Sequence, residues 1–495
     1  MELQFERREC AYMRCNVRQV QNLEQAQEVR LPEGMPDIGR VLCAWGQGML
    51  RSKEWRNDGM TVTGSMQISV LFAPEDGSEP RSMEISLPFV GKWSFPECKR
   101  EGSMIVSVQV CEVDVRALSA RKMMVRATAG VLAQAFEPTQ TAVFTPGQGL
   151  SDVELLHRTY PAVLLREAGE KQFMVDEDLQ LNTTPRKILS CQVDPVMTDK
   201  AAAGGRVVLR GECRVHLVYM DEADRMCSED VMLPFAQLSQ LDRDYDKDAT
   251  AQVTMAVTNV DVHLNDGNAH LQCGLVAQYM IFDRYLLEVA EDAYSPFMPV
   301  QPTLEMLTLP MLLETHQEML DTSVQLSASA TSVVDVTSRM WQPAVYREGD
   351  TVTMEIPGNV QVLYYDMDGN LRCDCQNFTG RMQLEADAAC QILPDILLQR
   401  TPLVMNLGDK LQIDGGADVQ VCAVVRQELP MVTGLTLGER SIPDPRRPSL
   451  ILQRMGDAGL WEMAKCCGST VTAIEQANGL QGEPSVGQLL LIPVV

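Results

Sequence analysis

The sequence predicts a mainly β protein, with three tandem β-sandwich- or barrel-like repeats of about 145 residues followed by a small βααβ module. Three observations support this fold class. Runs of alternating apolar residues recur at a nearly constant spacing, and each is followed by turn residues and a second strand. Helical periodicity is poor until the last 47 residues, where two short helices are expected.

The strongest repeated feature is a run in which apolar residues or glycine alternate over thirteen positions. Such alternation is typical of a half-buried strand. The three runs end 147 and 145 residues apart. They are residues 60–72, 207–219 and 352–364. A glycine inside each run suggests a bulge or a sharp bend, and it lies two residues later in the third copy. These glycines are Gly64, Gly211 and Gly358.

A turn and a second strand follow each run. The expected turns, rich in Asp and Gly, are residues 74–77, 221–224 and 366–370. The sequences Leu87-Pro88-Phe89 and Leu233-Pro234-Phe235 are expected at the end of the second strand, with Gln376-Asn377-Phe378 as a degenerate third copy. These matching positions make a chance repeat improbable.

A later pair of strands also recurs. Val113–Val115 matches Val260–Val262 at a separation of 147 residues. In the second copy, residues 265–268 (Asn-Asp-Gly-Asn) predict a hairpin turn, and residues 407–410 occupy the corresponding place in the third.

The leading part of each repeat is less regular and is expected to hold an irregular arm or a short helix that packs on the sheet. These parts are residues 24–42, 170–189 and 316–326. The repeats are accordingly expected at 1–148, 149–297 and 298–437. A proline-rich, extended linker is expected at 438–448, before the module at 449–495.

Composition excludes several classes of partner. The net charge of −25 argues against nucleic acid and against an anionic membrane surface. There is no run of about 20 apolar residues, so no membrane span is expected, and the first ten residues do not resemble a secretory signal. The 15 cysteines are therefore interpreted as reduced thiols of a cytosolic protein.

Motifs for catalysis or metal binding are weak. Residues 242–248 space carboxylates like the start of a calcium loop, but Ala249 stands where glycine is needed, so a solvated loop is expected. Cys373 and Cys375 share one face of a strand without further zinc ligands and are interpreted as core or edge thiols. The repeats share no acid, base or nucleophile. The sequence therefore predicts no enzyme, no cofactor and no metal site.

The C-terminal module is expected to form two short strands around two helices. Asp457 is expected to cap the first helix, and Ser469 or Thr470 the second. Asn478-Gly479 is expected to end the second helix. Of the adjacent Cys466 and Cys467, one is expected to be buried and one exposed.

The module resembles LysM. The matching residues are Gly456, Asp457, Leu460, Trp461, Ala464, Asn478, Gly487, Gln488, Leu489, Ile492 and Pro493. The first loop departs from the pattern, because one residue is inserted and Ala458-Gly459 replaces threonine. In LysM modules this loop and the loop after the second helix line a groove for N-acetylglucosamine chains. The candidate partner-binding residues are Asp457, Ala458, Gly459, Trp461, Gln481, Glu483 and Ser485. For Trp461, core packing of the first helix is an equally good interpretation.

The order of three β repeats and one LysM module resembles the SipL-like family of spore-coat morphogenesis proteins, whose repeats are SPOCS domains. Residues 31–38 and the Leu-Pro-Phe sequences contribute to this resemblance. It implies a non-enzymatic adaptor in spore coat and cortex assembly, located in the mother-cell cytosol at the forespore surface. Its LysM module would bind the coat basement-layer ATPase, alongside other coat proteins.

Two alternatives remain open. The first is a protein that binds peptidoglycan or N-acetylglucosamine chains through LysM. The second is a structural coat subunit that assembles by pairing exposed strand edges.

Overall fold

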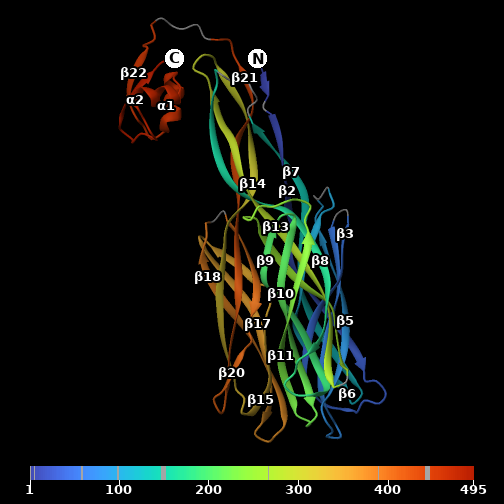
Figure 1. The fold of residues 1–495 in the computed structure, drawn as a ribbon. Helices are drawn as coiled ribbons and strands as arrows, with labels where there is room; N and C mark the ends of the chain where they lie inside the picture. Colours follow the sequence, from blue (N-terminus) through green and yellow to red (C-terminus); the bar gives the residue numbers. More distant parts are fainter. Residues whose placement is uncertain are drawn as a thin grey trace.

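The computed structural model describes residues 2–4, 6–56, 59–96, 100–145, 152–265, 267–387, 390–440 and 446–495. The chain is mainly β, as predicted. Figure 1 shows an elongated body of long strands that narrows into a stalk, with the small helical module at the stalk end. Among the described residues, no helix has the length and apolar character needed to cross a membrane.

The first part of the body consists of two three-stranded antiparallel sheets. One sheet has the order β2 (Glu6–Arg30), β7 (Lys122–Thr145), β6 (Ser103–Ser119). The other has the order β3 (Ile38–Arg56), β4 (Gly59–Pro74), β5 (Arg81–Ser94).

The second part repeats this order of strands. One sheet contains β8 (Glu154–Leu179), β13 (Asn268–Tyr294) and β12 (Thr250–Asn265), with β13 in the middle. The other contains β9 (Pro185–Ala203), β10 (Arg206–Asp221) and β11 (Met226–Gln240), with β10 in the middle. Asn265 pairs with Asn268, so the predicted hairpin is present, while Asp266 lies outside the described residues.

The third part has the same central strands, but two of its outer strands are divided into shorter pieces. Strand β21 (Leu411–Leu437) pairs with β14 (Val300–Leu326), β19 (Cys390–Gln399), β20 (Leu403–Asn406) and β1 (Glu2–Gln4). Strand β17 (Thr351–Asp366) pairs with β15 (Ala330–Met340), β16 (Ala344–Glu348) and β18 (Leu371–Glu385).

The alternating runs form the central strands β4, β10 and β17, as expected. No helix forms in the leading segments, which the structure describes in full. Residues 316–326 lie wholly in the long strand β14, whereas 24–42 and 170–189 run from the ends of the long strands β2 and β8 through a short irregular stretch into β3 and β9. Side chains of β8 and of the described part of β14 are often exposed, which weakens the alternation. These strands are held by backbone pairing along almost their whole length with β7, β13 and β21.

Each repeated glycine lies directly opposite a phenylalanine. The cross-strand pairs are Gly64 with Phe89, Gly211 with Phe235, and Gly358 with Phe378. A Cβ on these glycines would lie 2.3, 2.4 and 2.6 Å from the phenylalanine ring. Each ring therefore occupies the space that the glycine leaves open.

This pairing corrects one prediction and explains another. The phenylalanines lie inside β5, β11 and β18, so the expectation that they mark a strand end was wrong. In the third copy the glycine is two residues later and the phenylalanine correspondingly earlier, which keeps the pair aligned because the strands are antiparallel. The expected bulges are present beside Gly64 and Gly211, in the pairing with β3 and β9.

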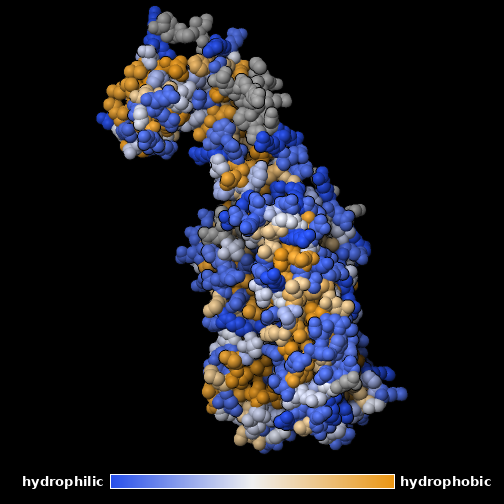
Figure 2. Space-filling view, viewed as in Figure 1, coloured by the Kyte–Doolittle hydropathy of each residue, from blue (hydrophilic) through white to orange (hydrophobic). Residues whose placement is uncertain are grey.

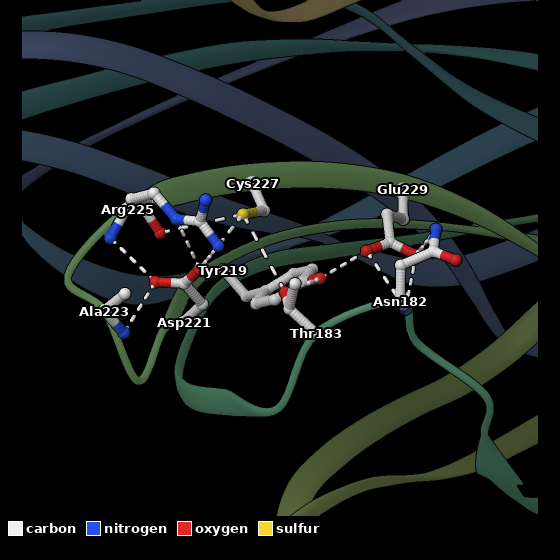
Figure 3. A network of polar contacts seen from close by, with 8 residues as sticks. All are labelled: Asn182, Thr183, Tyr219, Asp221, Ala223, Arg225, Cys227 and Glu229. Carbon is white, nitrogen blue, oxygen red and sulfur yellow. Dashed lines mark hydrogen bonds and ion pairs between the residues drawn. The ribbon is translucent and has the colours of Figure 1, made fainter.

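The three predicted turns between central and second strands share a backbone hydrogen bond. Gly77, Asp224 and Gly369 donate to the carbonyl oxygen three residues earlier, over 3.1–3.3 Å. In the second copy the Asp221 carboxylate also accepts from the backbone N–H groups of Ala223 and Arg225 (Figure 3). Asp366 makes the same contacts with residues 368 and 370. Turn chemistry therefore explains these acidic residues.

The three parts of the body share one buried junction. It combines side chains from β3, β4, β9, β10, β11, β17 and β18. Its members are Leu42, Cys43, Trp45, Leu71, Leu189, Val218, Met220, Met226, Leu363 and Leu371. A second shared core in the stalk takes side chains from the three strand pairs β2–β7, β8–β13 and β14–β21. The three parts of the body are therefore joined by cores to which all of them contribute.

A buried carboxylate connects all three parts at the junction. Asp335 of β15 accepts hydrogen bonds from Trp45 Nε1 (3.3 Å) and Ser228 Oγ (2.8 Å). It also forms an ion pair with His216 Nε2 at 2.9 Å, and His216 Nδ1 lies 2.7 Å from Asp230. Burial alone would lower the pKa of His216, but its contacts with Asp230 and Asp335 raise that pKa to about 10.

Candidate partner-binding site

The C-terminal module has the predicted βααβ order. It contains β22 (Leu450–Arg454), α1 (Gly459–Cys467), α2 (Val471–Asn478) and β23 (Leu489–Pro493). The helices cover one face of the two-stranded sheet and bury a small core with it. The buried core residues of the module are Met455, Leu460, Met463, Ala464, Cys467, Ile474, Leu490 and Ile492.

Most predictions for the helix ends hold. Thr470 caps α2, because its side chain accepts from the Ala473 N–H at 3.1 Å. Gly479 ends α2 in the left-handed conformation with φ of 62°. The cap predicted for α1 was wrong, because Ala458 is the N-cap residue and makes no side-chain bond. Asp457 lies one position before the N-cap.

Asn478 has a further structural role that sequence reasoning did not assign. Its amide donates to the Leu491 carbonyl at 2.6 Å and accepts from the Leu491 N–H at 2.8 Å. The side chain therefore pairs with β23 like a short piece of strand and ties α2 to the sheet. Cys467 is buried and Cys466 is exposed, as expected.

Six of the seven predicted contact residues lie in two loops of the module or, for Gly459, at the first position of α1. Asp457, Ala458, Gln481, Glu483 and Ser485 are exposed, and Gly459 is half-buried. The loops are joined by backbone hydrogen bonds of 2.8 Å from Gly487 to Met455 and from Met455 to Gln488. A Cβ added at Gly456, Gly459 or Gly482 would meet nothing within 4 Å, so the loops border open solvent.

The seventh residue, Trp461, is placed elsewhere. It packs on the module's own core and also against Tyr294, the last residue of β13, with ring centroids 4.7 Å apart in a T-shaped arrangement. The indole N–H donates to the Asp292 carboxylate at 2.9 Å, and Lys465 donates to the same oxygen at 2.6 Å. Trp461 therefore joins the module to the body.

Two further features belong to this contact. The Tyr294 hydroxyl donates to the Ser469 carbonyl at 3.0 Å. Burial would raise the pKa of Asp292, but the bonds from Lys465 and Trp461 outweigh it and lower that pKa, so the carboxylate stays ionised. The contact thus combines aromatic packing with a charged hydrogen-bond network.

The structure also reveals an exposed surface that the sequence reasoning missed. On the sheet face that the helices leave uncovered, Leu450 pairs with Pro493, Leu452 with Leu491, and Arg454 with Leu489. Leu450, Leu452 and Leu489 are 51%, 62% and 48% exposed. We name Leu450, Leu452, Leu489, Leu491 and Pro493 the apolar sheet face. Figure 2 shows hydrophobic residues at the surface of the module, at upper left.

A signal for this face is present in the sequence. Residues 489–493 are apolar at every position, and Leu450, Ile451 and Leu452 are also consecutive. A continuous apolar run is typical of a strand that is covered on both faces. The helices of the module cover only one of them.

The acidic segment considered as a calcium loop lies between two strands. Residues 242–248 lie in the loop between β11 and β12, where all but Tyr245 are exposed. Across the part of the chain that the structure describes, no group of three or more His, Cys, Asp or Glu side chains is arranged to hold a metal ion.

Comparisons of the chain with known protein families, with curated proteins and with solved structures found no match.

Proposed function

We propose that the chain is a non-enzymatic adaptor for spore envelope assembly that binds a protein partner through its C-terminal module. The partner inferred from the LysM and SPOCS resemblance is the coat basement-layer ATPase, met in the mother-cell cytosol at the forespore surface. The observation that supports binding of a protein is the apolar sheet face.

Physical chemistry favours a protein surface as the occupant of this face. Burying a leucine side chain contributes about 1.5–3 kcal/mol. Leu450, Leu452 and Leu489 together therefore offer several kcal/mol to a partner with a complementary apolar surface. The face carries no aromatic ring on which a sugar could stack, and its exposed members are leucines.

The long body gives the adaptor its second property. Its strands are continuous over up to 27 residues and share cores along the length of the molecule. Such a body can hold the module at a fixed distance from a partner that binds the end of the body opposite the stalk. Other coat proteins are the proposed partners of the body.

The test is binding of the purified full chain to the purified coat basement-layer ATPase. Leu452→Asp places a charge on the apolar sheet face and is expected to weaken binding at least about tenfold, which corresponds to about 1.4 kcal/mol. The matched control is Leu238→Asp, which changes a leucine of similar exposure on β11 of the body and is expected to bind like the unchanged chain.

The same proteins distinguish the alternatives. Retention of the chain on insoluble peptidoglycan, together with no binding to the purified ATPase, would replace the proposal with glycan recognition through the loops. Normal ATPase binding by Leu452→Asp would show that the apolar sheet face is not the contact. Polymerisation that rises with concentration in the absence of the ATPase would favour a self-assembling coat subunit.

A further inference from the structure

Two cysteine thiols meet at the junction between the first and third parts of the body. Cys43 of β3 and Cys373 of β18 have their sulfur atoms 3.3 Å apart although the residues are 330 positions apart in sequence. Cys43 is 4% exposed and Cys373 is half-buried. They are the thiols of two different sheets, brought together by the packing of the junction.

The surroundings hold both sulfur atoms in place. The side-chain amide of Gln361 on β17 lies against Cys43 and donates to Cys373 at 3.5 Å and to the Ala44 carbonyl at 3.2 Å. Cys43 belongs to the shared buried core, and Cys373 packs against it. The pair is therefore fixed by neighbours on both sheets.

The two cysteines lie in parts of the body that are not consecutive in the chain. The polypeptide joins the first part to the second and the second to the third, whereas the first and third parts meet through side-chain packing at the junction and through the pairing of β1 with β21. A disulfide bond between Cys43 and Cys373 would join the first and third parts of the body covalently.

We propose that Cys43 and Cys373 are a redox modification site, at which a disulfide forms when the protein meets a peroxide. A disulfide bond is about 2.05 Å long, so the two sulfur atoms need to approach by little more than 1 Å. The inference does not depend on the proposed adaptor function.

The chemistry proceeds in two balanced steps. The Cys373 thiolate attacks one oxygen of hydrogen peroxide, the O–O bond breaks, and Cys373 becomes a sulfenic acid while hydroxide leaves. The Cys43 sulfur then attacks the sulfenic sulfur, the S–O bond breaks, and the departing hydroxyl takes the Cys43 proton and leaves as water while the S–S bond forms. The hydroxide from the first step takes up the proton that the Cys373 thiol released when it ionised. The two sulfurs lose two electrons, and the peroxide is reduced to two waters.

The order of these steps follows from access. A partly open cavity of about 280 Å³ is lined by Cys43, Cys373 and Cys375, which gives a small oxidant a route to the pair. Burial raises the pKa of Cys43, so its thiol stays protonated and is the poorer first nucleophile. Cys373 is the more exposed of the two and reacts first.

The experiment uses the folded full chain treated with hydrogen peroxide, followed by alkylation of remaining thiols, proteolysis and mass spectrometry. The expected result is a cross-linked peptide pair containing Cys43 and Cys373, together with faster migration of the chain on a non-reducing denaturing gel. Both signals are expected to disappear after treatment with dithiothreitol.

Variants separate this site from its neighbours. Cys373→Ser is expected to lose the cross-link, whereas Cys375→Ser, two positions along the same strand and exposed, is expected to retain it. A Cys373–Cys375 product, or free Cys43 and Cys373 after all exposed thiols have been oxidised, would overturn the proposal. Circular dichroism of each variant checks that the fold is retained.

Discussion

Trp461 of α1 donates its indole N–H to the Asp292 carboxylate of β13, across a separation of 169 residues in the chain. Lys465, one helical turn later, donates to the same carboxylate oxygen. The contacts of Asp292 with Trp461 and Lys465 thus attach the module to the stalk, in addition to the proline-rich segment that precedes the module. Tyr294 packs beside the indole of Trp461.

Replacing Asp292 by alanine should release this anchor. A charged acceptor of two hydrogen bonds is lost, and such bonds typically contribute about 1.5–3 kcal/mol each when buried, less where water reaches them as it does here. We expect faster hydrogen exchange in α1 and faster acylation of Lys465 by an N-hydroxysuccinimide ester. Glu462→Ala, an exposed acidic residue of the same helix, is the control. Unchanged Lys465 reactivity would show that packing on Tyr294 alone holds the module.

Gly64→Ala should destabilise the first part of the body. The added Cβ would lie 2.3 Å from the Phe89 ring and 2.4 Å from the Met49 carbonyl oxygen, and the backbone atom cannot move cheaply. Overpacking of this kind costs about 1–3 kcal/mol. Urea unfolding followed by circular dichroism measures the loss. Gly456→Ala has open space around its Cβ and is expected to unfold like the unchanged chain.

Gln278 supplies a second test of the packing between parts of the body. This fully buried amide of β13 accepts from the Val106 N–H at 2.9 Å and donates to the Val106 carbonyl at 2.7 Å, and Lys53 donates to the same side-chain oxygen at 2.8 Å. Gln278→Leu removes the partner of the Val106 N–H and carbonyl, at a cost of about 1–3 kcal/mol for each one that stays buried. Lys53 keeps its contacts with the Met104 carbonyl and Glu170. Thermal unfolding should therefore begin at lower temperature, whereas the exposed Gln240→Leu should leave it unchanged.

His216 should make the stability of the junction depend on pH in the alkaline range. Its pKa is raised to about 10, so its stabilising charge is fully present below the unfolded pKa of about 6.5 and is lost as the pH rises through 10. Contacts with His216 lower the pKa of Asp335 despite its burial, so the contribution of Asp335 is lost only as the pH falls below about 3.8.

The measurement is the urea midpoint between pH 6 and pH 10 for the unchanged chain and for His216→Gln. The difference between the two proteins is expected to shrink steadily across this range. A difference in urea midpoint that stays constant with pH would show that His216 stabilises the junction through packing and not through its charge.

Much of the fold is visible in the sequence because it is local. Alternation identified β4, β10 and β17, and the turn residues after them were placed correctly. The long strands β2, β8 and β14 were missed because backbone pairing, which leaves no sequence signal, holds them. The Gly–Phe pairing was hidden for a related reason, since the register of two antiparallel strands is set by the turn between them.

In the candidate site, too, local features could be predicted from the sequence, whereas contacts between distant segments could not. The loop residues around Asp457 and Gln481 could be placed from local turn signals. The contact of Trp461 with Asp292 joins two distant segments, and one sequence carries no information on that pairing. The apolar sheet face was predictable in principle, because β23 is apolar on both sides and only one side is covered by helices.

The shared junction has a consequence for how such a molecule can vary. In an assembly of three identical subunits, every substitution at the common centre would appear three times, and a tryptophan, a histidine and an aspartate could not meet there singly. A chain that carries its three copies in series is free of this constraint. Trp45, His216 and Asp335, which come from different strands of the three copies, can therefore each occur once at the centre while the strand framework around them is retained.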